Sequence, residues 1–161
     1  MWILKENLVA IISGLAFILS LSSWIYTFIT QRKKLSIRLV EAKSKNEMTI
    51  LQVLIENRSR LPISITRLQL VINEESIDCV TTPEIVLETK TSQGKEVISR
   101  RDYYSMDMPI NIGSLGAVGG YLLFRGPQCM LPNDATSVIL VVCANRGRPF
   151  QTTLPLPQDC P

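Results

Sequence analysis

The stretch LQVLIENRSRLPISITRLQLVI, residues 51–72, holds two apolar runs separated by a polar turn. Every second residue from Leu51 to Ile55 is apolar, and this two-residue period predicts a β-strand. In the second run the apolar positions change phase near Thr66 or Arg67, which a β-bulge with one extra residue would produce. We therefore expect two strands with a turn between them.

The rest of the chain after residue 34 continues in the same way, without a sustained 3.6-residue apolar period. Turn-forming residues separate the runs, since all nine prolines lie at position 62 or later and seven of the eight glycines lie after position 90. We predict an all-β fold for residues 35–161, an antiparallel sandwich of seven to nine strands. The run at 137–144 is apolar on both faces, which predicts a strand in the centre of a sheet.

Residues 49–65, TILQVLIENRSRLPISI, resemble an immunoglobulin-like pattern, in which an apolar strand ends in Asn-x-Ser and proline begins the next strand. The stretch GGYLLF at 119–124 is similar to a return strand of such modules. Comparable patterns occur in adhesion-type and water-stress-type sandwich modules and in small single-pass bacterial or phage membrane proteins. The resemblance implies an immunoglobulin-like sandwich, although the Cys…Trp…Cys arrangement of antibody domains is absent. A fold of this kind does not by itself imply a function.

An uncharged apolar segment, LVAIISGLAFILSLSSWIYTFI, occupies residues 8–29. As a helix it would reach about 33 Å, enough to cross a hydrocarbon core of about 30 Å. We predict a short tail at 1–7, a transmembrane helix at 8–30 and a basic juxtamembrane collar at 31–34. The run is too long for a cleaved signal peptide and lacks a small-residue cleavage site, which favours an uncleaved signal-anchor.

The residues that end this segment predict its orientation. Trp24 and Tyr26 suit the headgroup layer of a bilayer, and the collar bases Arg32, Lys33 and Lys34 follow directly. Positively charged flanks remain on the cytoplasmic side, so we expect the large domain to face the cytoplasm at the cell membrane.

Small residues recur in the apolar segment at spacings of three and four: Ser13, Ala16, Ser20, Ser23 and Thr27. Such a stripe lets two membrane helices approach closely, which predicts a homo-oligomer formed through the helix. The alternative is that a membrane helix simply tolerates these residues without a partner.

The charge distribution argues against nucleic-acid binding. The chain of 161 residues carries a net charge of +3. Four of the 17 bases and one of the 14 acids precede residue 35, which leaves 13 of each in residues 35–161. A nucleic-acid-binding protein would concentrate its basic excess on the folded domain.

The sequence offers no convincing catalytic, metal or cofactor site. The chain has no histidine, which excludes Ser–His and Cys–His nucleophile pairs and histidine-ligated metals. The redox state of the four cysteines, which lack C-x-x-C spacing, stays open. Asn57-Arg58-Ser59 matches a glycosylation sequon, for which a turn role of Asn57 is sufficient. The cysteines are Cys79, Cys129, Cys143 and Cys160.

One segment that combines charge with aromatic rings is expected to be a solvated loop, with contact to anionic lipid or to a partner as the alternative: Arg100, Arg101, Tyr103 and Tyr104. We expect a single-pass, non-catalytic interaction or accessory subunit, with membrane lipid and another protein as partners. An alternative is an extracytoplasmic adhesion or envelope protein with disulfides. A carrier of an apolar ligand, or a membrane-bound enzyme, would need a deep pocket with convergent polar groups.

Overall fold

The computed structural model of the chain describes residues 2–30, 32–45, 47–72, 74–93, 96–126, 129, 131–132 and 135–156. The chain divides into two units, Met1–Arg32 and Lys33–Pro161. The first unit contains one helix, α1 (Trp2–Thr30). The second unit, the β-domain, contains β1 (Leu35–Lys45), β2 (Met48–Asn57), β3 (Ile63–Ile72), β4 (Glu75–Asp78), β5 (Ile85–Gln93), β6 (Glu96–Tyr104), β7 (Ile110–Ile112), β8 (Ala117–Arg125), β9 (Ser137–Ala144) and β10 (Phe150–Pro155).

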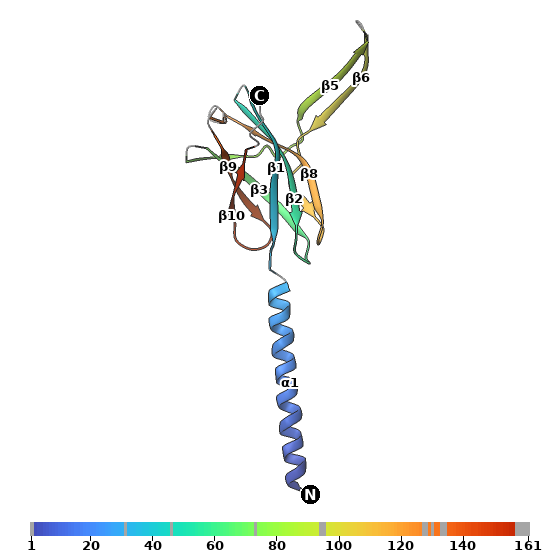
Figure 1. Cartoon of the computed structure of the whole chain (residues 1–161), viewed down its shortest axis with the longest axis vertical. Helices are drawn as coiled ribbons and strands as arrows, with labels where there is room; N and C mark the ends of the chain where they lie inside the picture. Colours follow the sequence, from blue (N-terminus) through green and yellow to red (C-terminus); the bar gives the residue numbers. More distant parts are fainter. Residues whose placement is uncertain are drawn as a thin grey trace. The chain divides into compact units, whose positions relative to one another are not determined.

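The β-domain is built from antiparallel sheets, which confirms the predicted strand class (Figure 1). One sheet has the order β1-β2-β8, and a second has the order β10-β9-β3-β4 with β7 also paired to β3. Strands β5 and β6 pair only with each other among the described residues. The described residues thus form ten strands where seven to nine are predicted, because the short strands β4 and β7 each pair with part of β3.

The strand register bears out the phase change in the sequence. Where β3 pairs with β9, the register shifts between Ile65 and Arg67, at the predicted bulge. The shift keeps both Ile65 and Leu68 buried, although they are three positions apart and would face opposite sides of a regular strand. One inserted residue therefore lets both halves of β3 face the same core.

Both sheets contribute to one hydrophobic core. Leu51, Val53 and Ile55 from β2 are buried in the same cluster as Leu70 from β3 and Phe124 from β8. Fully burying each such side chain is worth about 1.5–3 kcal/mol, so this shared core holds the two sheets together.

Strand β9 lies in the centre of its sheet, between β10 and β3, as predicted. Its two faces differ, however. Val138, Leu140 and Val142 are buried, whereas Ile139 is exposed and Val141 is half-buried. The predicted central position of this strand is therefore confirmed, although its outer face is only partly covered.

The end of β2 is organised by Asn57, whose side chain is buried. Its Nδ2 donates hydrogen bonds to the carbonyl oxygens of Leu61 (2.9 Å) and Gly113 (2.8 Å). Its Oδ1 accepts bonds from the Ser59 backbone N–H (3.0 Å) and from Ser59 Oγ (2.6 Å). One side-chain amide therefore forms hydrogen bonds with two loops at the same end of the domain, the one at 58–61 and the one at 113. This confirms the turn role of Asn57 in the sequon.

Replacing Asn57 with alanine removes these four bonds and leaves the N–H of the buried residue Ser59 without its acceptor. We expect Asn57→Ala to lower the free energy of unfolding of the detergent-solubilised chain by about 2–4 kcal/mol, measured by urea titration with circular dichroism. Asn145→Ala is the matched control, because exposed Asn145 makes one bond to the Ser64 N–H. An equal effect of the two substitutions would refute the role given to Asn57.

Candidate functional site

Helix α1 presents apolar side chains to its surroundings along most of its length. The window Ile11–Phe28 has a mean hydropathy of 1.7, and none of it is buried within the structure. Phe17, Leu19 and Trp24 are each about 70% exposed. The helix is therefore long and apolar enough for a membrane span or a signal sequence, as predicted.

The predicted collar is shared between the two units. In the first unit the Arg32 guanidinium lies 5.3 Å from the centre of the Phe28 ring, and Trp24 stacks on Phe28 with ring centres 6.2 Å apart. In the β-domain the Lys33 ammonium lies 4.6 Å from the Phe150 ring centre and donates to the Arg148 carbonyl oxygen at 3.3 Å. Burial lowers the pKa of Lys33 from its ordinary value.

The five small residues of the predicted stripe all lie on α1 and are exposed. At about 100° per residue they fall within a sector of about 80°, so the helix gathers them on one face. The Thr27 hydroxyl donates to the Ser23 carbonyl oxygen at 2.8 Å, within the helix. The homo-oligomer stays a prediction.

The segment Arg100–Tyr104, predicted as a loop, forms the second half of β6. The charged residues do not break the strand, because β5 supplies pairing partners for them, for example Glu88 opposite Asp102. Side chains of adjacent strand residues point to opposite faces, so the two arginines are separated, as are the two tyrosines. The four residues therefore do not form one patch, and the loop prediction is wrong.

The two faces of the β5–β6 ribbon differ in charge balance. On one face Glu88 pairs with Arg100 at 2.8 Å and with Lys90 at 3.1 Å, and Arg100 also pairs with Asp102 at 3.1 Å. These ion pairs are largely solvent-exposed and add little stability. Arg101, on the opposite face, is exposed.

The base of this ribbon is attached to β8. The Met106 N–H, just after β6, donates to the Tyr121 carbonyl oxygen of β8 at 2.8 Å, and Arg125 of β8 forms an ion pair of 2.8 Å with Glu84, just before β5. The Tyr103 ring meets the Tyr121 ring edge-on, with centres 6.1 Å apart. Of the four residues of the predicted loop, Tyr103 therefore has a structural role.

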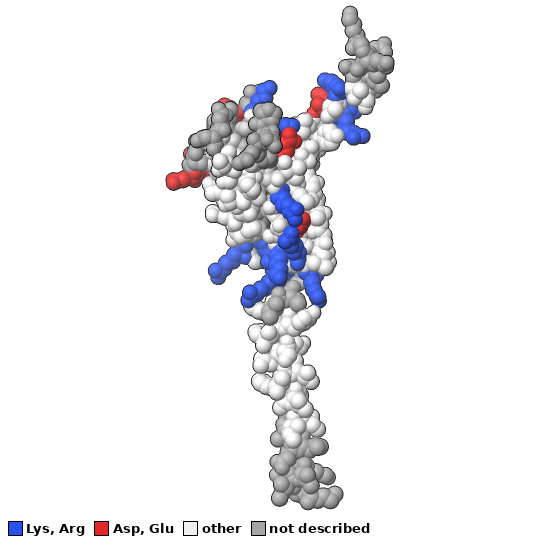
Figure 2. Space-filling view, in the orientation of Figure 1, with Lys and Arg blue, Asp and Glu red and all other residues white. Residues whose placement is uncertain are grey.

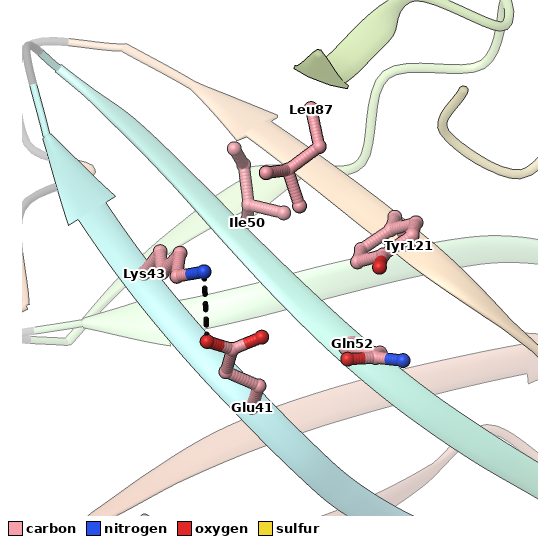
Figure 3. A pocket seen from close by; sticks show the side chains of 6 residues that line it. All are labelled: Glu41, Lys43, Ile50, Gln52, Leu87 and Tyr121. Carbon is pink, nitrogen blue, oxygen red and sulfur yellow. Dashed lines mark ion pairs between the residues drawn. The ribbon is translucent and has the colours of Figure 1, made fainter. Parts of the chain in front are cut away.

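Beside this attachment lies a shallow hollow of about 160 Å³, shown in Figure 3. Leu87 of β5 lies beside Ile50, and Lys43 forms an ion pair of 2.8 Å with Glu41. That volume includes open solvent, and the space that a water-sized sphere can enter is about 0 Å³, so the hollow has no room for a small molecule, whose sites usually measure about 300–1,000 Å³. Within the described part of the chain, no group of three or more His, Cys, Asp or Glu residues could hold a metal ion.

Three cysteines lie within the described residues, and all three are free thiols. Cys79 and Cys129 are buried and Cys143 is half-buried, whereas Cys160 lies outside the described residues. Burial raises the pKa of Cys79 to about 11 and also raises the pKa of Cys129. Since the thiolate is the reactive form, these two buried thiols are poor nucleophiles at neutral pH.

No family model and no curated protein matches the chain.

Thiol reactivity provides a test of this arrangement. At pH 8 only about one Cys79 thiol in a thousand is ionised, so we expect iodoacetamide to alkylate Cys143 well before Cys79 or Cys129. Raising the pH toward 11 increases the thiolate fraction of Cys79. Mass spectrometry of peptides from the folded chain measures the order, with the urea-unfolded chain as control. Alkylation of Cys79 at the rate of Cys143 in the folded chain would contradict the burial described above.

Proposed function

We propose that this chain is a membrane-anchored, non-catalytic interaction or accessory subunit that presents its β-domain at the inner surface of the cell membrane. The apolar surface of α1 supports the anchor, since hydrocarbon is the environment that such a helix requires. The bases Arg32, Lys33 and Lys34 at its C-terminal end support a cytoplasmic β-domain.

We further propose that the β-domain is an immunoglobulin-like sandwich. The strand pairing supports this assignment. The order β1-β2-β8 corresponds to strands A, B and E of that fold, and β10-β9-β3-β4 corresponds to G, F, C and C′. The β5–β6 ribbon would then be an elaboration of the connection between C′ and E, where the described residues hold no D strand paired to β8.

The observation that carries the interaction role is the β5–β6 ribbon. It projects beyond the two larger sheets, and its strands pair only with each other within the described part of the chain (Figure 1). A two-stranded ribbon has little stability of its own in water. At its base, Ile85 and Tyr104 face each other across the strands and are 50% and 55% exposed. Open strand edges beside exposed apolar side chains suit a protein partner that adds a strand or packs on one face.

Anchoring would make a modest contact sufficient. A chain confined to the membrane meets partners in the same membrane at a high effective concentration, so the assembly needs less affinity per contact. An accessory subunit could therefore assemble through a small contact surface.

Site-specific photocrosslinking in cells tests the partner surface. A photoreactive amino acid at Arg101 or Thr89, on the exposed ribbon, is expected to give a discrete adduct with another protein. The control is the same amino acid at Thr153 of β10, which is equally exposed but lies on the body of the domain. Adducts from Thr153 and none from the ribbon would refute the proposed contact surface.

A further inference from the structure

Four segments that are remote in sequence meet at one end of the β-domain. The Arg58 N–H donates to the Lys34 carbonyl oxygen at 2.7 Å, and the Leu115 N–H donates to the Ser59 carbonyl oxygen at 3.1 Å. Lys33 contacts the β9–β10 turn through the Arg148 carbonyl oxygen. We call this region the basic end and define it as residues 33–38, 56–62, 113–117 and 144–150.

The basic end carries seven bases and one acid. Glu56, the acid, already pairs with Arg58 at 2.7 Å and with Arg38 at 3.5 Å. Figure 2 shows Lys and Arg side chains gathered at the end of the β-domain where β1 begins. Residues 35–161 are neutral in total, and Lys33 and Lys34 add two positive charges, so folding gathers the rest of this excess at one end. The bases are Lys33, Lys34, Arg38, Arg58, Arg60, Arg146 and Arg148.

A leucine is exposed at the same end. Leu115 is 71% exposed, more than any other large apolar side chain of the β-domain among the described residues. Its φ of 53° lies in the left-handed region, which leucine rarely adopts. Both the exposure of Leu115 and its positive φ are unfavourable for a domain surrounded by water. A contact outside the domain would account for them better.

The chain length limits where this end can lie. Lys33 is three residues beyond Thr30, the last residue of α1, so it stays within about 11 Å of that residue in any arrangement of the two units. If α1 ends at the headgroup layer, at least one base of the basic end is held there covalently.

From these observations we infer that the basic end of the β-domain binds the anionic phospholipid headgroups of the membrane in which α1 is anchored, with Leu115 inserted between them. Clustered bases attract an anionic leaflet, and an apolar side chain among them adds burial at the interface. This inference rests on the proposed anchor and adds a second, electrostatic attachment. It would orient the β-domain on the membrane.

Hydroxyl-radical footprinting of the full chain in lipid nanodiscs tests the inference. Oxidation of Leu115 is expected to be about threefold slower in equimolar phosphatidylcholine and phosphatidylserine than in phosphatidylcholine alone, because the rate follows side-chain exposure. Oxidation of Ile85, on the ribbon, is the internal reference and should not change. At about 1 M salt, where the screening length is about 3 Å, the difference should disappear. Equal oxidation of Leu115 in the two lipids would overturn the inference.

A matched pair of variants separates local charge from total charge. Arg60→Gln, Arg146→Gln and Arg148→Gln together should abolish the protection of Leu115 in anionic nanodiscs. Lys90→Gln, Arg100→Gln and Arg101→Gln together remove the same charge from the ribbon and should retain the protection. An equal loss of Leu115 protection in both variants would show that the lipid responds only to the total positive charge of the chain. That result would overturn the specific role of the basic end.

Leu115→Asn distinguishes membrane contact from a structural role. Asparagine tolerates a positive φ better than leucine, so the unfolding temperature of this variant in phosphatidylcholine nanodiscs, which lack anionic headgroups, should be equal or higher. A lower unfolding temperature would assign Leu115 to the fold and count against the inference.

The proposed anchor and the inferred headgroup binding have separate readouts. Incorporation of the chain into nanodiscs reports on the anchor, and oxidation of Leu115 reports on headgroup binding, so the failures of the two proposals are distinguishable.

Discussion

The apolar surface of α1 is the constraint on which the rest of the account depends. Eleven large apolar side chains between Ile11 and Phe28 are exposed within the structure. Leaving each one in water instead of hydrocarbon costs about 1.5–3 kcal/mol. Because these side chains are 47–70% exposed, the sum over the eleven is on the order of 10–20 kcal/mol, comparable with the whole stability of a typical domain, so water is a very unfavourable environment for the helix. This balance favours a bilayer as the environment of the helix. What then remains is which side of the membrane the β-domain faces and which of its surfaces make contacts.

Strand β8 links the two surfaces that the β-domain offers. At its start, near Ala117, it adjoins the loop that Asn57 holds in place. In its second half, Tyr121 and Arg125 contact the β5–β6 ribbon and its base, Arg125 through an ion pair of 2.8 Å with Glu84. Tyr121 lies four positions and Arg125 eight positions after Ala117, which is about 13 Å and 26 Å along the strand. A rigid strand of this length would keep a lipid-facing end and a partner-facing ribbon from competing for the same space.

Much of the architecture could be predicted from local patterns. Alternation predicted β2 and β3 and located the bulge near Thr66, because a two-residue period directly reflects which side chains face the core. Only the second half of β6, Arg100 to Tyr104, is predicted to be a loop, because it mixes charge with aromatic rings. The described side chains of the β5–β6 ribbon are all half-buried or exposed, so these strands do not need an alternating apolar pattern.

The basic end could not be predicted from the sequence, since its charges come from three separate segments. Counting bases along the chain gave a neutral domain, and only the pairing of β1, β2 and β8 brings Arg58 near Lys34. Leu115 carried no local signal either, because one leucine in a glycine-rich loop is unremarkable until its φ and exposure are known. For the predicted contact residues Arg100 to Tyr104, the sequence indicates charge and aromatic character. It does not indicate that they lie on a strand whose alternating side chains place them on opposite faces.

Alkaline carbonate extraction of cell membranes that contain the full chain tests the central claim most directly. Carbonate removes proteins held only by ionic contacts and leaves those whose helices lie in hydrocarbon. The account predicts that the full chain stays in the membrane pellet, whatever the charge of the basic end. Release of the full chain into the supernatant, as a protein that remains folded without detergent, would contradict it.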